Sequence, residues 1–183
     1  MKLYVISGLG ADKTVFENIV FPEKFSEIIF IDWLIPETEE TFEHFVKRMA
    51  KPIDEKEKFC LLGYSFGGIM VQEINKLKPA EKIVILGSIK SQKEMSVTFH
   101  LAKKSKIFSK IPESYFGEKT LKSYAFFRKL FDPKNPKFWR YFVVQNPHYL
   151  KWSINKILDW KFEENPDIVQ ILADKDIVFP PKN

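Results

Sequence analysis

A chain of 183 residues, 45% hydrophobic and 29% charged, is long enough for one sizeable core and too short for two independent domains. The net charge of +5 is mild, and a single cysteine, Cys60, excludes an internal disulfide and gives no basis for a thiolate metal site. The apolar stretch at the start is too short for a signal peptide, and the longest charge-free run, 59–72, is too short to span a membrane. We therefore expect a cytoplasmic protein with no membrane span.

Short apolar runs rich in Val, Ile and Phe recur along the chain with helix-like segments between them. Their hydrophobicity is continuous rather than alternating, which indicates strands covered on both faces, as in a parallel sheet. The strand–helix–strand order implies right-handed crossovers and an α/β fold with one doubly wound, mostly parallel sheet. The predicted strands are Lys2–Ser7, Glu27–Asp32, Lys58–Gly63, Lys82–Gly87 and Asp167–Leu172.

Two helices are expected between the early strands. Residues Thr38–Met49 carry acids in the first turn and Lys-Arg near the last, as the helix dipole prefers. Residues Gly67–Leu77 form the second helix, which ends before Lys78-Pro79.

Residues 90–160 break this rhythm, because their pattern is wholly helical and aromatic. An insertion between two strands of a parallel sheet leaves and returns at the same edge. We therefore expect a helical lid over the carboxyl ends of the strands, where open α/β sheets bind ligands. The predicted organisation is a core made of 1–89 and 161–183 and a lid made of 90–160. The lid helices are expected at Met95–Phe108, Glu118–Phe131, Lys137–Val144 and Tyr149–Trp160.

The positive charge is concentrated in this lid. Residues 90–140 hold thirteen Lys or Arg against four acids, a net of +9, which leaves −4 for the rest of the chain. A solvated face is one interpretation. A surface that attracts an acidic partner or an anionic substrate is the other.

The segment Gly63-Tyr64-Ser65-Phe66-Gly67 is a G-x-S-x-G motif placed after a fully apolar strand and before a helix. Such a turn forces the serine into a strained conformation, and the neighbouring chain passes so close that glycine is needed at positions 63 and 67. The Ser65 hydroxyl would then stand clear of the sheet at a helix N-terminus, where developing negative charge is favoured. The alternative is a tight turn whose serine merely caps the helix.

With this motif in this context, the chain resembles the α/β-hydrolase family over nearly all of its length. The stretch Ser7–Asp12 resembles the family's oxyanion loop, with Ser7-Gly8-Leu9 where the family usually has His-Gly-x. The resemblance implies that the backbone N–H groups of Leu9 and Phe66 hold the oxygen of a tetrahedral intermediate. A glycine-rich connection into a short helix is the alternative. A phosphate-binding loop fits less well, because the Lys-Ser/Thr pair is missing.

The catalytic acid should follow the last strand. The family's His-Gly-x-x-Asp-x-x-x-Pro segment aligns Asp176 with the acid and Pro180 with the proline, although Leu172-Ala173 departs from His-Gly. Asp174 is the reserve candidate, and for both aspartates a solvated turn acid is the alternative. We interpret Asp32, at the end of the second strand, as a structural or pocket-edge residue.

The histidine base of the family, which follows the acid, has no counterpart in 177–183. We interpret each of the three histidines as a surface or satisfied core residue: His44, His100 and His148. His148 is the one to test as a substitute base. Two explanations stay open. The ending resembles the family pattern cut before its last strand and helix, or the protein naturally lacks the base.

The resemblance implies a serine hydrolase that acts on a carboxylic ester or thioester through an acyl-enzyme on Ser65. The alternative is a catalytically impaired α/β-hydrolase-like binding protein or a truncated fragment. No metal or organic cofactor is implied. Nucleic-acid binding is disfavoured because it would leave the strained serine unexplained.

The lid aromatics indicate either an apolar acyl pocket or simple packing against the sheet. Together with the basic segment they suggest an acyl chain delivered by an acidic carrier protein. These aromatics are Phe99, Phe108, Phe126, Phe127 and Trp139.

Overall fold

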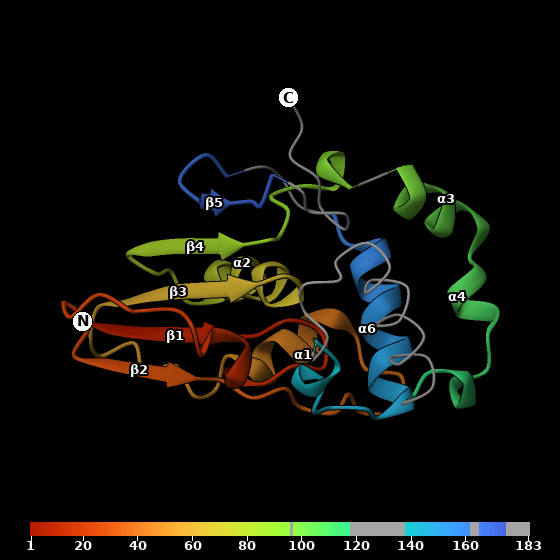
Figure 1. Cartoon of the computed structure of the whole chain (residues 1–183), viewed down its shortest axis with the longest axis horizontal. Helices are drawn as coiled ribbons and strands as arrows, with labels where there is room; N and C mark the ends of the chain where they lie inside the picture. The colour runs from red at the N-terminus through yellow and green to blue at the C-terminus, as the bar shows by residue number, and fades with distance from the viewer. Residues whose placement is uncertain (96, 118–137, 162–164, 175–183) are drawn as a thin grey trace.

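In the described part of the chain, five strands form one parallel sheet in the order β2-β1-β3-β4-β5. The computed structural model describes residues 1–95, 97–117, 138–161 and 165–174 (Figure 1). The predicted α/β fold with a parallel sheet is confirmed, although the last strand is shorter than expected. The strands are β1 (Lys2–Ile6), β2 (Glu27–Phe30), β3 (Phe59–Tyr64), β4 (Lys82–Leu86) and β5 (Val169–Ile171).

Helices α1 (Phe42–Met49) and α2 (Phe66–Leu77) lie between the early strands. The predicted start of the first helix at Thr38 is wrong. Thr41 is its N-cap, and its hydroxyl accepts a hydrogen bond from the His44 N–H at 3.2 Å. Glu39 has a φ of 58°, a left-handed conformation that cannot continue a helix.

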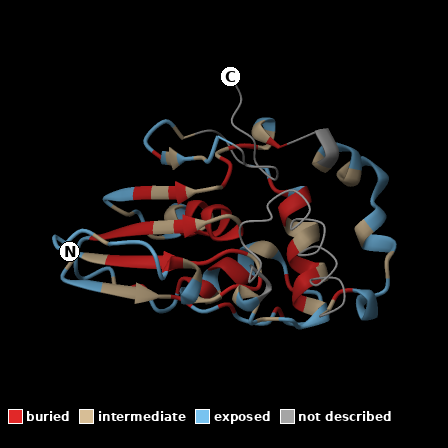
Figure 2. Cartoon of the chain, viewed as in Figure 1, coloured by how far each residue is buried: buried red, intermediate tan, exposed pale blue. Residues whose placement is uncertain are grey.

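The two faces of the sheet are covered differently. Tyr4, Ile6 and Leu61 face α1 and α2 in the main core. Leu3, Val5 and Cys60 form a smaller cluster on the other face. That cluster is closed by Phe16 of the 3-10 helix η1 (Lys13–Phe16) and by partly buried aromatic residues that follow it. Figure 2 shows the buried residues concentrated along the central strands and the adjacent helices.

Beyond the carboxyl ends of the strands lie the elements of the expected lid (Figure 1). They are η2 (Gln92–Glu94), α3 (Val97–Ser105), α4 (Ile107–Lys110), η3 (Glu113–Tyr115), η4 (Phe138–Tyr141) and α6 (Pro147–Asp159). The expected helix Glu118–Phe131 lies outside the described residues, as do Phe126 and Phe127. Among the described residues, no helix has both the length and the apolarity needed to cross a bilayer.

Two predicted lid helices are wrong in extent. The single helix Met95–Phe108 is broken at Lys106, which has a φ of 52°. The helix Lys137–Val144 ends at Tyr141, because Phe142 pairs with Ala11 in an antiparallel bridge. The remaining predicted helix exists as α6, which begins at Pro147 after an Asn146 side-chain cap.

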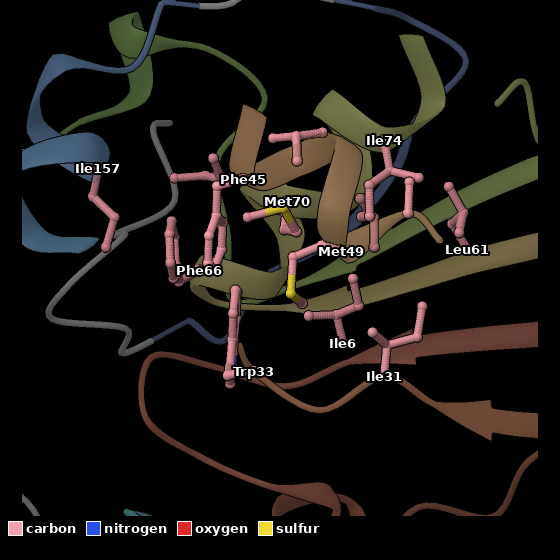
Figure 3. Close-up of a cluster of buried hydrophobic side chains, with 14 of the residues drawn as sticks. Ile6, Ile31, Trp33, Phe45, Met49, Leu61, Phe66, Met70, Ile74 and Ile157 are labelled. Carbon is pink, nitrogen blue, oxygen red and sulfur yellow. The ribbon is translucent and has the colours of Figure 1, made fainter. Parts of the chain in front are cut away.

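Helix α6 belongs to the same core as the sheet. Its Trp152 ring lies 4.6 Å from the ring of Phe45 in α1, and its indole N–H donates to the Glu40 carbonyl at 2.9 Å. Phe99 and Phe108 of the lid are partly buried and pack against this main core. Figure 3 shows the central part of the cluster, including Phe45, Phe66 and Trp33.

Candidate active site

The turn between β3 and α2 places Ser65 in a strained conformation, with φ 53° and ψ −118°. The two glycines of the motif occupy places where a side chain would collide with backbone. A Cβ on Gly63 would lie 2.3 Å from the Gly67 carbonyl oxygen, and a Cβ on Gly67 would lie 2.2 Å from the Ile6 carbonyl oxygen. The start of α2 therefore rests directly on the end of β1.

Ser65 is held by its backbone, and its hydroxyl makes no hydrogen bond to any of the described residues. Its N–H donates to the Leu86 carbonyl at 2.9 Å, and its own carbonyl accepts from the Gly68 N–H at 2.9 Å. Across the described residues, the Ser65 side chain makes no capping hydrogen bond to α2. Ser65 thus stands at the N-cap position of α2, but its partly exposed side chain does not provide the capping bond that the alternative interpretation required.

The loop after β1 packs against this turn. A Cβ on Gly8 would lie 3.4 Å from the Ser65 Cβ. Within the loop, the Ser7 hydroxyl donates to the Ala11 carbonyl at 2.6 Å, and the Ala11 N–H donates to the Gly8 carbonyl at 3.0 Å. Ser7, at the position where the family usually has histidine, thus closes the loop on itself.

Two N–H groups remain unused at this junction. Within the described ranges, neither the Leu9 N–H nor the Phe66 N–H donates a hydrogen bond. The Phe66 N–H is at the first position of α2, where helical N–H groups have no partner within the helix. N–H groups without another partner are the donors that stabilisation of an oxyanion requires.

The acid candidates are only partly described. Asp176 lies outside the described residues, and Asp174 is exposed in the turn after β5.

The three histidines lie in different surroundings. His44 is exposed on α1 with its Nδ1 2.6 Å from Glu40 Oε1, and His100 is exposed on α3. His148, near the start of α6, has its Nδ1 3.0 Å from Glu113 Oε1. Its Nε2 is buried and has no hydrogen-bond partner among the described residues. None of the described contacts joins a histidine to Ser65.

The negative charge of a carboxylate cluster at the start of α1 is balanced by a neighbouring arginine. Glu37, Glu40 and His44 each place one potential metal-ligand atom within 4.8 Å of the others. Arg48 lies 2.8 Å from Glu40 and 3.6 Å from Glu37. Burial alone would raise the pKa of Glu40, but hydrogen bonds from the Glu37 N–H, Arg48 and His44 outweigh it and lower this pKa. The cluster is therefore a structural ion-pair network.

A shallow cleft of about 500 Å³ opens beside the end of β2, away from the serine. Asp32 and Arg48 line it together with apolar side chains that include Phe30, Leu34 and Met49. Asp32 thus lies at the edge of a cleft that Ser65 does not line.

Comparisons with known proteins define the fold. No protein-family model and no curated protein matches the sequence. An esterase from Thermogutta terrifontis matches with a TM-score of 0.65 and 10% identity over 99% of this chain and 74% of that chain. A hydrolase from Pseudomonas aeruginosa matches with a TM-score of 0.64 and 13% identity over 98% and 74%. MenH from S. aureus matches with a TM-score of 0.62 and 15% identity over 85% and 65%.

The chain therefore has the α/β-hydrolase fold, as the G-x-S-x-G motif and its context predicted. It spans 65% of the length of MenH and 74% of the other two structures. Because folds of this kind support many functions, activity must be argued from the site itself.

Two residues at the site carry no motif signal in the sequence. Trp33 and Tyr149 are buried beside the loop after β1, Trp33 shortly after β2 and Tyr149 in α6. The indole N–H of Trp33 donates to the Gly8 carbonyl at 2.8 Å. Tyr149 accepts from the Gly10 N–H at 3.2 Å, and burial raises the pKa of this phenol above its ordinary value, which keeps it protonated.

Proposed function

We propose that the protein is a serine hydrolase that cleaves a carboxylic ester or thioester through an acyl-enzyme on Ser65. The observation that supports it most is the junction of the strained Ser65, whose side chain does not cap α2, with the Leu9 and Phe66 N–H groups, which donate no hydrogen bond within the described residues. Strain is retained where the surrounding structure enforces it, which is common at catalytic positions.

In this reaction the Ser65 oxygen forms a bond to the acyl carbon while its proton passes to a base. The oxyanion receives hydrogen bonds from Leu9 and Phe66, and the alcohol or thiol leaves with the proton. Water then attacks the acyl-enzyme by the same route and releases the carboxylic acid. Asp176 is our candidate for the residue that orients the base, with Asp174 in reserve.

His148 is the candidate for the base. A general base needs one ring nitrogen oriented by a carboxylate and the other free to take a proton. With His148 as the base, Glu113 and not Asp176 is the orienting carboxylate, because it lies 3.0 Å from Nδ1, and Nε2 has no partner among the described residues. Asp176 keeps the orienting role only for a different base. His44 offers a matched control, because its Nδ1 also pairs with a glutamate but its side chain is exposed.

The test is hydrolysis of short and long acyl esters and thioesters. Ser65→Ala should abolish turnover, and His148→Gln should lower kcat at least about a hundredfold while His44→Gln leaves it unchanged. Equal rates for His148→Gln and the parent protein would remove His148 from the mechanism. Turnover retained in Ser65→Ala would contradict the proposal.

The second candidate function is a binding protein with the same fold. The observation that favours it is the absence, among the described residues, of a contact between Ser65 and any histidine. Such a protein would bind acyl compounds without hydrolysing them. Saturable binding of an uncleaved ester by calorimetry, with no product released, would identify it.

We further propose that residues 90–160 act as a lid and that its basic face receives an acidic carrier protein bearing the acyl group. Lys104, Lys106 and Lys110 are exposed on α3, α4 and the turn between them. Within the described segments, these lysines form no ion pair. Leu101 and Ile107 are exposed beside them, which suits a partner that is anionic with apolar contacts at its centre.

A further inference from the structure

Catalysis of the proposed kind depends on how far apart the Leu9 and Phe66 N–H groups are held. One donor lies in the loop after β1, and the other opens α2, so they belong to separate segments of the chain. A misplacement of about 1 Å can cost roughly a hundredfold in rate. Something must therefore fix the loop and the helix relative to each other.

Trp33 contacts both segments at once. Its ring stacks on the ring of Phe66 with centroids 4.9 Å apart and an interplanar angle of 6° (Figure 3). The indole N–H of the same side chain donates to the Gly8 carbonyl at 2.8 Å. Gly8 immediately precedes Leu9. The rigid side chain of Trp33 therefore contacts Phe66, which bears one donor, and also the neighbour of Leu9, which bears the other.

The other side of the loop is held by α6 and the segment that precedes it. The Gly10 N–H donates to the Tyr149 hydroxyl at 3.2 Å, and the Gly10 carbonyl accepts from the N–H groups of Val143 and Val144 at 2.7 and 2.9 Å. The Tyr149 ring in turn lies 5.9 Å from the Trp33 ring. Both neighbours of Leu9 are therefore bonded to buried aromatic side chains, while the Leu9 N–H between them donates to none of the residues that the structure describes.

From this arrangement we infer that Trp33 is a positioning residue that sets the separation of the two oxyanion donors, with Tyr149 as its support. The inference rests on the proposed function. It assigns to Trp33 no contact with the substrate. Its effect is on the transition state, because the ground-state ester does not need both donors at one fixed distance.

The test uses three variants of buried aromatic residues. Trp33→Phe keeps an aromatic ring beside Phe66 and removes the N–H that holds Gly8, while Tyr149→Phe removes only the hydroxyl that holds Gly10. Trp152→Phe is the matched control, because Trp152 is also buried and its indole N–H also donates to a carbonyl, that of Glu40, at 2.9 Å. The control removes the same kind of bond, and no described hydrogen bond joins Trp152 to the loop after β1.

For a small ester, we expect Trp33→Phe to lower kcat by roughly ten- to a hundredfold with KM changed less than about twofold. Tyr149→Phe should have a smaller effect in the same direction. Trp152→Phe should keep the parent kcat, even if its melting temperature falls as much as that of Trp33→Phe. A kcat in Trp33→Phe equal to that of the control would overturn the inference.

Backbone 15N relaxation on the same variants separates this inference from the proposed function. We expect the order parameter of the Leu9 N–H to fall from about 0.85 to below about 0.6 in Trp33→Phe and to stay high in Trp152→Phe. If the parent protein hydrolyses nothing, the proposed function fails while this measurement still decides the role of Trp33. Unchanged order at Leu9 and Phe66 in Trp33→Phe would refute the positioning role.

Discussion

The turn that carries Ser65 and the segment 97–117 lie toward the same end of the sheet, but they are held in place in opposite ways. At the turn, backbone approaches backbone so closely that glycine is required at positions 63 and 67. In segment 97–117, Leu101, Ile107 and Tyr115 are exposed, and the chain changes direction at the left-handed Lys106. The comparison indicates that the fold confines the turn tightly and leaves the outer segment exposed, which is where the proposed carrier protein would bind.

The largest expected effect comes from adding one methyl group at the turn. Alanine favours a helix over glycine by about 1 kcal/mol, so propensity alone would make Gly67→Ala stabilising. The new Cβ would instead meet the carbonyl oxygens of Ile6 and Ser7 at 2.2 and 2.4 Å. We expect a loss of roughly 1–3 kcal/mol or more in the free energy of unfolding, together with loss of esterase activity.

Gly117→Ala is the matched control in the outer segment. Its nearest described neighbour would lie 3.9 Å from the added Cβ, an ordinary contact. Urea unfolding of both variants should show the parent midpoint for Gly117→Ala and a lower one for Gly67→Ala. A stabilised Gly67→Ala with full activity would show that the turn is not confined as described.

A smaller effect is expected from the buried carboxylate of Glu40, which ties the segment before α1 to Arg48 in that helix. The Glu40 side chain is 1% exposed and ion-paired with Arg48, so Glu40→Gln should cost about 1–3 kcal/mol. Glu43→Gln, on the same helix but exposed beside Lys47, should change stability little. Thermal unfolding of the two variants at neutral pH compares them directly.

The pH dependence follows from the same site. Because the pKa of Glu40 is lowered in the folded state from its ordinary value of 4.5, its contribution is complete above that value and is lost as the pH falls below it. The parent protein should therefore lose stability more steeply than Glu40→Gln as the pH falls below 4.5. Identical pH profiles would show that Glu40 does not contribute in this way.

The smallest effect on the fold, and the most selective one on function, is expected from charge reversal in the basic segment. Replacing Lys103, Lys104 and Lys106 by Glu should leave the melting temperature and the hydrolysis of a small ester unchanged. Hydrolysis of an acyl group on an acidic carrier protein should fall at least about tenfold at low salt. Reversal of exposed Lys13, Lys51 and Lys56 is the control, and equal loss on both substrates would count against a carrier surface.

The sequence predicted the sheet and the Ser65 turn well because their signals are local. Continuous apolar runs identify buried parallel strands, and the two glycines flanking the serine mark close backbone approaches, one within the turn at Gly63 and one to the end of β1 at Gly67. The contacts of Trp33 and Tyr149 could not be predicted, since each bonds a loop residue 25 or 139 positions away. The break in the helix at Lys106 was not predicted either, because a lysine gives no signal of a left-handed conformation.

The most direct test of the account is the site of covalent labelling by a fluorophosphonate probe. We predict one adduct per chain in the folded protein, mapped by peptide mass spectrometry to Ser65 and absent from Ser65→Ala. Labelling should vanish when the parent protein is unfolded in urea, because the free serine is not activated. A folded parent protein that stays unlabelled, or an adduct on another residue, would contradict the claim that this turn presents an activated nucleophile.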